Sequence, residues 1–128
     1  MKKFEGKNVL VVDDKQGYRD VYSFIMEPLG IHLECAQNGK EGVDKVREKP
    51  YDVIFMDVHM PVMDGYAALK EIKSLRPGQK IVIFSSSSDP EFIREKKALK
   101  EGAVECLYKP MDIEQVEKVL EKALEEEA

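Results

Sequence analysis

The chain is poor in cysteine and contains no long apolar segment. Cys35 and Cys106 are its only cysteines and do not form a Cys-x-x-Cys motif, so neither zinc binding nor thioredoxin-like redox chemistry is supported. Both fall in strand-like segments, where we expect small buried thiols rather than a disulfide. No apolar run approaches the roughly 18–20 residues of a membrane span, and residues 1–6 lack the apolar stretch of a signal peptide. We therefore expect a cytoplasmic protein with no membrane partner.

Positive charge is also in deficit. Twenty Lys and Arg face 25 Asp and Glu, which gives a formal net charge of -5. Because the phosphates of DNA repel an acidic surface, we expect no direct binding to nucleic acid. The length of 128 residues and the hydrophobic share of 43% fit one globular domain with a buried core.

Apolar runs alternate with amphipathic stretches along the chain, which predicts five strands separated by helices. Strands joined through helices pair in parallel with right-handed crossovers. The prediction is therefore an α/β fold, a doubly wound (βα)5 parallel sheet in the flavodoxin-like order 2-1-3-4-5. The predicted strands are Asn8–Val12, Ile31–Ala36, Asp52–Asp57, Lys80–Ser85 and Ala103–Tyr108.

The helices are predicted from caps and apolar spacing. Asn38 with Glu41, and Asp64, are expected to cap the second and third helices, while Asp89-Pro90 starts the fourth. Asp112 with Gln115 is expected to cap the fifth, whose apolar stripe is Ile113, Val116, Leu120, Ala123 and Leu124. The first helix, from Gln16 to about Glu27, is expected to bury the stripe Tyr18, Val21, Phe24, Ile25 and Leu29.

Acidic residues stand at the carboxyl ends of two of these predicted strands. Asp13 and Asp14 follow the first strand, and Asp57 ends the third. In the expected order these strands are neighbours, and ligands bind at such a switch point beyond the carboxyl ends of the strands. Three gathered carboxylates repel one another, and Mg2+, which prefers oxygen ligands, relieves that repulsion. The turn at Asp13 has no glycine-rich phosphate loop, which disfavours a flavin or nucleotide site.

The same edge carries the parts needed for phosphoryl transfer. A carboxylate can act as the nucleophile and form an aspartyl phosphate, and catalysis then depends on positioning and charge neutralisation. Asp57 is the natural acceptor, and Asp13 and Asp14 hold the metal. Lys109, at the end of the fifth strand, supplies an ammonium, and Ser85, at the end of the fourth, supplies a hydroxyl.

Four motifs in register resemble the receiver domain of two-component response regulators. They are Val9–Asp14, Asp57 with Met60–Gly65, Ser85-Ser86 and Lys109-Pro110, and together they cover essentially the whole chain. The resemblance implies that Asp57 takes a phosphoryl group from a phosphohistidine on a sensor histidine kinase or a histidine phosphotransfer protein. It also implies Mg2+ as the cofactor, with Mn2+ able to substitute.

The resemblance assigns further roles around Asp57. Asp14 binds Mg2+ directly, Asp13 binds it through water, and the backbone carbonyl of His59 is a third contact. Ser85 and Lys109 contact the phosphoryl oxygens, and the Lys109–Pro110 peptide bond is expected to be cis. Ser86 and Met60 are the residues expected to neighbour the phosphoryl group.

One position departs from the family pattern. Many receivers carry Tyr or Phe three residues before the lysine, and its rotation together with the strand-4 hydroxyl reports phosphorylation. Here Cys106 takes that place, so the switch positions Ser85 and Cys106 lack the aromatic side chain of the family pattern, whereas phosphoryl acceptance does not depend on it. Tyr108 is aromatic, but we expect it to project differently from the strand.

We interpret residues 1–128, with a core of about 7–125, as a stand-alone receiver domain. It is a phosphoacceptor switch rather than a turnover enzyme, and its output is binding to a downstream protein. We expect a monomer, with dimerisation on phosphorylation as the alternative. The alternatives kept open are a module cut from a larger regulator, a phosphorelay intermediate and a pseudo-receiver scaffold. An aspartyl phosphatase is disfavoured, because position 59 holds His where such enzymes place a second acid.

Overall fold

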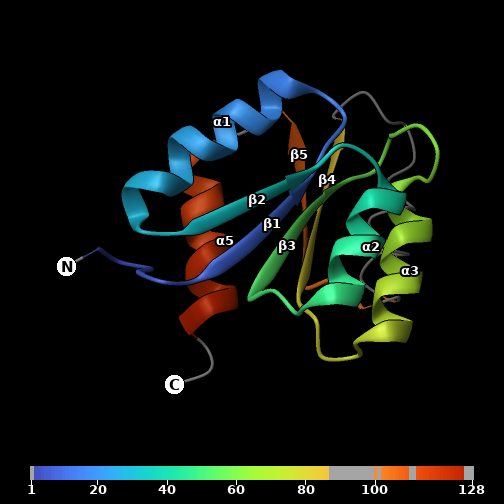
Figure 1. The fold of residues 1–128 in the computed structure, drawn as a ribbon. Helices are drawn as coiled ribbons and strands as arrows, with labels where there is room; N and C mark the ends of the chain where they lie inside the picture. Colours follow the sequence, from blue (N-terminus) through green and yellow to red (C-terminus); the bar gives the residue numbers. More distant parts are fainter. Residues whose placement is uncertain (1, 87–99, 101, 110–111, 126–128) are drawn as a thin grey trace.

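The computed structural model describes residues 2–86, 100, 102–109 and 112–125. Five strands form one parallel sheet in the order β2-β1-β3-β4-β5, so the predicted fold and strand order are confirmed (Figure 1). The strands are β1 (Asn8–Val12), β2 (His32–Ala36), β3 (Val53–Asp57), β4 (Ile81–Ser86) and β5 (Glu105–Lys109).

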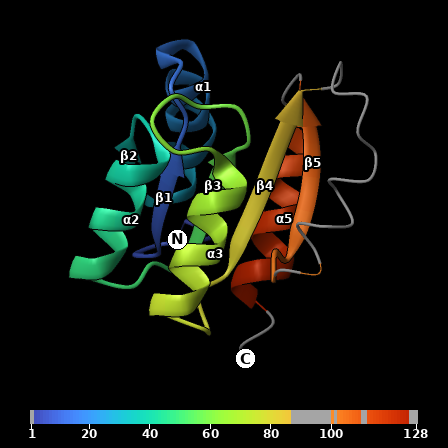
Figure 2. The same ribbon diagram turned by 90° about the vertical axis from the view of Figure 1, so that its right-hand side faces the viewer.

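Helices cover both faces of this sheet, as Figures 1 and 2 show. One face carries α1 (Gln16–Met26) and α5 (Ile113–Glu125), and a short 3-10 helix, η1 (Glu27–Leu29), continues α1. The other face carries α2 (Gly39–Glu48) and α3 (Gly65–Leu75). The helix predicted to start at Asp89-Pro90 lies outside the described residues. None of the described helices is both long and apolar enough to cross a bilayer.

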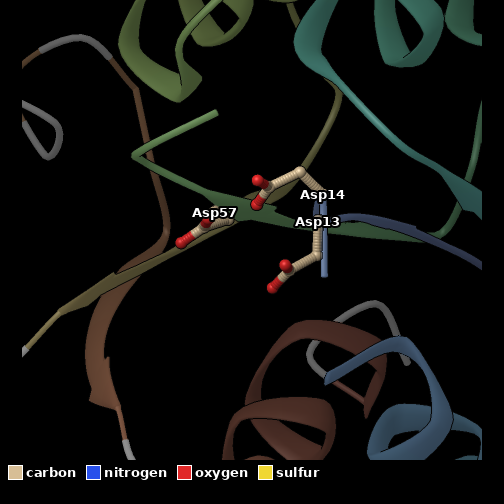
Figure 3. Close-up of side chains that lie close together, drawn as sticks. All are labelled: Asp13, Asp14 and Asp57. Atoms are coloured by element: carbon tan, nitrogen blue, oxygen red, sulfur yellow. The ribbon is translucent and has the colours of Figure 1, made fainter. Parts of the chain in front are cut away.

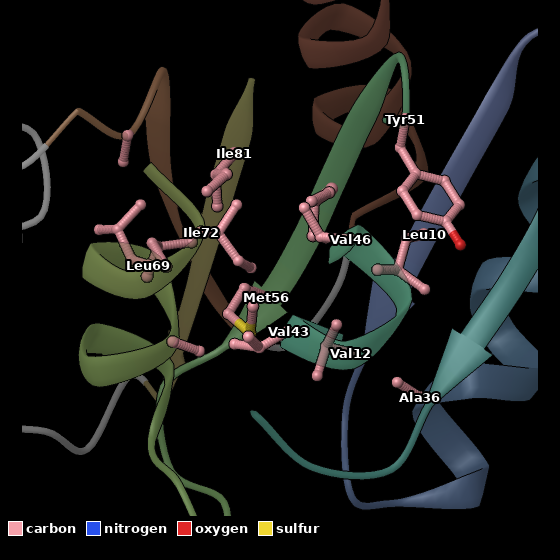
Figure 4. Close-up of a cluster of buried hydrophobic side chains, with 14 of the residues drawn as sticks. Leu10, Val12, Ala36, Val43, Val46, Tyr51, Met56, Leu69, Ile72 and Ile81 are labelled. Atoms are coloured by element: carbon pink, nitrogen blue, oxygen red, sulfur yellow. The ribbon is translucent and has the colours of Figure 1, made fainter. Parts of the chain in front are cut away.

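The strands are apolar at nearly every position because both faces of the sheet are buried. Successive side chains of a strand point to opposite faces. Leu10 and Val12 of β1 therefore pack under α2 and α3 (Figure 4), whereas Val9 and Val11 pack under α1 and α5. Full burial of one such side chain contributes about 1.5–3 kcal/mol.

Side-chain caps begin three of the helices. The Oδ1 atoms of Asn38 and Asp64 accept hydrogen bonds from the amides of Glu41 and Ala67, each at 2.8 Å, which confirms both predicted caps. Asp112 Oδ1 accepts from the amide of Glu114 at 2.8 Å. In contrast, no side chain caps α1, which begins immediately after the acidic turn at Asp13 and Asp14.

The predicted apolar stripe of α1 is wrong at two positions. Tyr22, Ile25 and Met26 are the buried residues of this helix, whereas Val21 is 40% and Phe24 is 74% exposed. With 3.6 residues per turn, a shift of one residue rotates a side chain by about 100°, so apolar residues adjacent in sequence face different directions. The prediction placed apolar residues of the outer face, Val21 and Phe24, inside the core.

The first residue of the predicted α5 stripe is also misplaced. Ile113 is half exposed and is the first residue of α5. Because helix side chains tilt toward the N-terminus, the side chain of a first residue extends past the end of its helix. The other four members, Val116, Leu120, Ala123 and Leu124, are buried as predicted.

The two cysteines are free thiols on opposite edge strands. Cys35 lies half-buried on β2 and Cys106 lies buried on β5, with three strands between them. Burial raises the pKa of the Cys35 thiol. The strand order therefore excludes a disulfide within the chain, as the sequence predicts.

Candidate functional site

The ends of β1 and β3 place three aspartates at one edge of the sheet (Figure 3). Val12 is the register partner of Met56, so Asp13 follows β1 at the level where Asp57 ends β3. The amide of Asp13 donates to the carbonyl oxygen of Ala36 at 3.1 Å, which extends the pairing with β2 by one residue. Parallel strands end at the same edge, and this is why residues far apart in sequence meet here.

One carboxylate oxygen from each of Asp13, Asp14 and Asp57 lies within 4.8 Å of the other two. Asp13 is 1% and Asp57 is 5% exposed. Asp14 is partly exposed, but its Oδ1 atom is buried and accepts no hydrogen bond from any described residue. The ammonium of Lys15 lies 3.6 Å from that atom. Three negative charges at such a spacing repel one another, and a cation between them would offset that repulsion.

Hydrogen bonds between side chains and backbone fix the turn after β1. The amide of Lys15 donates to Asp13 Oδ1 at 3.0 Å, and Arg19 Nη1 donates to the Asp13 carbonyl oxygen at 2.8 Å. These bonds tie the acidic turn to the first turn of α1. The Asp13 side chain is therefore held before any ligand arrives.

The segment after Asp57 is held equally closely. The amide of Val58 donates to the carbonyl oxygen of Phe84 at 3.1 Å, and the amide of Gly65 donates to the Val58 carbonyl at 2.8 Å. Met60 and Met63, between these points, are partly buried against the core under α2 and α3. The loop from Asp57 to α3 is thus anchored at both ends and in its middle.

The three acids suit a small, hard divalent cation. Mg2+ binds oxygen at about 2.0–2.1 Å in an octahedron, so two oxygens bound to one ion lie at most about 4.2 Å apart. A set of oxygens within 4.8 Å is therefore compatible with two direct carboxylate contacts and a third made through water. The buried Asp14 Oδ1, which lacks a hydrogen bond from the described residues, is an acceptor that such an ion would satisfy.

The other predicted site residues lie along the same edge where the structure describes them. Ser85 is the buried penultimate residue of β4 and follows Phe84, the register partner of Asp57. His59 is exposed, two residues beyond Asp57. The β5 residue Lys109 pairs in register with Ser86. The roles predicted for the side chains of Lys109 and Ser86, and the Lys109–Pro110 peptide bond, lie outside what the structure describes.

The expectation for Tyr108 needs correction. Cys106 is buried in the cluster under α2 and α3, and Leu107 packs on the opposite face with α1 and α5. Tyr108, two residues after Cys106, therefore lies on the same face as Cys106 and is 36% exposed. The two residues share a face because strand side chains repeat with a period of two.

Two residues near the site escaped the sequence analysis. Tyr22 lies buried on the face of α1 that the predicted stripe did not include. Val62, between Asp57 and α3, has a φ of +71°, which nothing in its residue type suggests. An apolar stripe placed on the buried face of α1 would have included Tyr22. No signal in the sequence marks Val62.

Comparison with known proteins identifies the family. The response regulator receiver domain matches residues 9–121, so the chain belongs to this family of two-component signalling domains. It is 39% identical over 117 residues to the transcriptional regulatory protein ZraR of Salmonella typhimurium, covering 91% of this chain and 26% of ZraR. It is 36% identical over 118 residues to the chemotaxis protein CheY of Thermotoga maritima, covering 91% of this chain and 97% of CheY. The chain thus spans about a quarter of ZraR and nearly all of CheY.

Solved structures agree with this assignment. The receiver domain of the Francisella response regulator 1452 superposes with a TM-score of 0.86 at 27% identity, covering 96% of this chain and 100% of that one. The receiver domain of the sensor histidine kinase PA1611 from Pseudomonas aeruginosa gives a TM-score of 0.80 at 25% identity, with 94% and 98% covered. That second structure has a magnesium ion coordinated in its active site cleft.

Proposed function

We propose that this receiver domain accepts a phosphoryl group on Asp57 from a phosphohistidine, in a reaction that depends on Mg2+. The observation that carries the proposal is the gathering of Asp13, Asp14 and Asp57 within 4.8 Å at the end of two neighbouring strands. Asp14, Asp57 and the backbone carbonyl of His59 would hold the ion directly, and Asp13 would hold it through water. Mg2+ supplies positive charge against the phosphoryl oxygens, and Mn2+ can take its place.

The transfer is a displacement at phosphorus. A carboxylate oxygen of Asp57 attacks, the phosphorus–nitrogen bond to the donor imidazole breaks, and its electron pair stays on nitrogen, which takes a proton from water. Ser85 donates a hydrogen bond to a phosphoryl oxygen, and the ammonium of Lys109 neutralises charge as it develops. Ser86 and Met60 line the space beside the group. Ser85 and Cys106 are the positions through which phosphorylation alters the surface.

Two further observations support this proposal. The PA1611 receiver, which shares the fold, holds magnesium in its active site cleft. In this chain, Asp14 Oδ1 is a buried acceptor without a hydrogen bond from the described residues, beside two nearly inaccessible carboxylates. The three carboxylates repel one another at this spacing, and a divalent cation bound between them would offset that repulsion.

The surface beside the acids suits a protein as the phosphoryl donor. A hollow of about 410 Å³ is lined by Lys15, Gly17, Tyr18 and Val21, and its lining is mainly apolar. On the same helix Phe24 is largely exposed. Exposed apolar side chains gathered beside a polar site are typical of protein docking surfaces. The histidine-bearing donor is a sensor histidine kinase or a histidine phosphotransfer protein, and a downstream protein reads the phosphorylated state.

The relatives support two ways in which the domain could work, as a module of a larger regulator or as a domain acting alone. The match to ZraR covers 26% of that regulator, which suits a module of a larger protein, whereas the match to CheY covers 97% and suits a domain acting alone. Passing the phosphoryl group on to a second histidine uses the same site. In each arrangement the domain acts as a phosphoacceptor switch. An aspartyl phosphatase is disfavoured, because the position two residues after the acceptor holds His59 and not a second acid.

The test is phosphorylation by acetyl phosphate, followed by intact mass measurement and peptide mapping. We expect one phosphoryl group on Asp57 with Mg2+ and none with excess EDTA. Asp57→Asn should remain unmodified. Asp64→Asn is the matched control, because Asp64 is an exposed aspartate that caps α3 and Asn also caps helices. A wild-type chain that stays unmodified, or modification that persists in Asp57→Asn, would contradict the proposal.

A further inference from the structure

Tyr22 of α1 is buried in the core next to the ends of the strands that carry the acidic site. It is 1% exposed, and its ring centroid lies 5.6 Å from that of Phe55 and 5.8 Å from that of Phe84. Phe55 precedes Asp57 by two residues on β3, and Phe84 is the register partner of Asp57 on β4. The Tyr22 ring therefore packs on Phe55 and Phe84, which neighbour Asp57 on β3 and β4.

The position of Tyr22 on α1 indicates that its hydroxyl is directed toward the acids. Side chains of a helix tilt toward its N-terminus, and α1 begins immediately after Asp13 and Asp14. Side chains two apart on a strand share a face, so Asp57 continues the face of Phe55, on which Tyr22 packs. Consistent with this placement, burial first and then the negative charges of Asp13 and Asp57 raise the pKa of the Tyr22 phenol well above its ordinary value.

The hydroxyl has no evident structural use in this position. Among the described residues of the buried hydrophobic cluster under α1 and α5, Tyr22 alone carries a hydroxyl, and the others have aliphatic, methionine and phenylalanine side chains. No hydrogen bond joins the Tyr22 hydroxyl to another residue in the described part of the chain. Phenylalanine would fill the same space without the cost of desolvating a hydroxyl. A neutral phenol between the core and the acidic site is instead suited to donate a hydrogen bond to the anionic groups of that site.

We propose that Tyr22 is a positioning residue of the acidic site, whose hydroxyl donates a hydrogen bond into that site on the side of Asp13 when a divalent cation is bound. The inference rests on the proposed function, since it takes the three carboxylates as the cation site. It adds a residue of α1, the helix beside the proposed donor surface, to the site formed by the strand ends.

The test compares Mg2+ binding by isothermal titration calorimetry in the wild type, Tyr22→Phe and Tyr51→Phe. Tyr51→Phe is the matched control, because the Tyr51 hydroxyl donates to Glu34 at 3.2 Å and lies at the opposite end of β3. A lost hydrogen bond in this setting should weaken Mg2+ binding by Tyr22→Phe about three- to tenfold. Tyr51→Phe should bind Mg2+ with the wild-type affinity.

Tyrosine NMR supplies a second measurement, which should not change on Mg2+ binding if Tyr22 serves only to pack the core. The chain has five tyrosines, so labelling their Cζ atoms with 13C gives few resonances, and the resonance missing from Tyr22→Phe assigns Tyr22. We expect this resonance to shift during Mg2+ titration while that of Tyr51 stays in place. Unchanged Mg2+ affinity in Tyr22→Phe, or a Tyr22 resonance that does not move, overturns the inference alone. A wild-type chain that binds no Mg2+ overturns the proposed function as well.

Discussion

A Cβ atom placed on Gly65 would lie 2.2 Å from the carbonyl oxygen of Asp57 and 2.9 Å from Cα of Val58. Both contacts are to backbone atoms, which cannot move aside as the end of a flexible side chain can. The glycine that opens α3 therefore allows this helix to start directly against the end of the acceptor strand. This close approach makes Gly65 part of what positions Asp57.

The first prediction concerns this contact. Gly65→Ala should displace the backbone at Asp57, lower the free energy of unfolding by roughly 1–3 kcal/mol as overpacking does, and slow phosphorylation by acetyl phosphate. Gly17→Ala is the control, because nothing lies within 4 Å of a Cβ at Gly17 in α1. There, alanine should stabilise by about 0.5–1 kcal/mol. Urea unfolding and the rate of phosphorylation measure both effects, and equal behaviour of the two variants would refute the role given to Gly65.

The second prediction concerns backbone strain at Val62. The amide of Met63 donates to the carbonyl oxygen of Pro61 at 2.8 Å across Val62, whose φ of +71° makes this a γ-turn of the strained kind. The Val62 side chain is 76% exposed and contributes little burial. Asparagine tolerates positive φ, so Val62→Asn should raise the free energy of unfolding by about 1 kcal/mol. Val62→Ala retains the strain and should gain much less. A loss of stability in Val62→Asn would show that the turn is not strained.

The third prediction tests the orientation of α1. Phe24 and Ile25 are adjacent in sequence, yet Phe24 is largely exposed and Ile25 is buried. Phe24→Ala should therefore change the free energy of unfolding by less than about 0.5 kcal/mol, whereas Ile25→Ala should lower it by about 2–5 kcal/mol. Thermal or urea unfolding of the two variants decides the matter. A larger loss for Phe24→Ala would mean that the helix faces the sheet as the sequence stripe predicts.

These two residues also show how far the sequence could lead. The strand order and the convergence of Asp13 with Asp57 follow from apolar runs and from the rules for parallel sheets, and the structure has both. The rotation of α1 does not follow, because Val21, Tyr22, Phe24 and Ile25 are all apolar or aromatic and fill more than one side of the helix. Only packing against Phe55 and Phe84 selects the face that carries Tyr22.

Val62 shows a second limit. Valine is a β-branched residue that rarely adopts positive φ, so the sequence argues against the turn that the loop adopts. The conformation is imposed by the neighbours of Val62. Met60 and Met63 pack against the core on either side of it, and Gly39 leaves room for the Met63 carbonyl, which would lie 2.5 Å from a Cβ at that position. Tertiary contacts of this kind are not visible in a local pattern.

The fourth prediction is a dependence of stability on pH through Glu34. The hydrogen bond from Lys49 is the main cause that lowers the pKa of Glu34, and Tyr51 and Lys45 lower it further, against the opposing effect of burial. Because the pKa is lower in the folded chain, the stabilisation is present above the ordinary carboxyl pKa and is lost as pH falls through the folded value.

Glu34→Gln should therefore be less stable than the wild type at pH 7, by up to about 1 kcal/mol for a partly exposed pair, and the difference should shrink below about pH 4. Urea unfolding at pH 7 and pH 3 measures it. Asp44→Asn, which removes an exposed partner of Lys40, is the control and should show a smaller difference at both values. A Glu34→Gln difference that grows toward low pH would reverse the sign of the linkage.

The central claim is that three carboxylates from two strand ends act as one cation site, and Mg2+ titration by calorimetry tests it most directly. We predict one ion bound per wild-type chain, and binding weakened at least about tenfold in Asp14→Asn, which removes a charged ligand. Asp112→Asn, which changes an exposed helix cap elsewhere in the chain, should leave binding unchanged. If the wild type binds no Mg2+, or if Asp14→Asn binds it as tightly as the wild type does, the three acids do not form the proposed site.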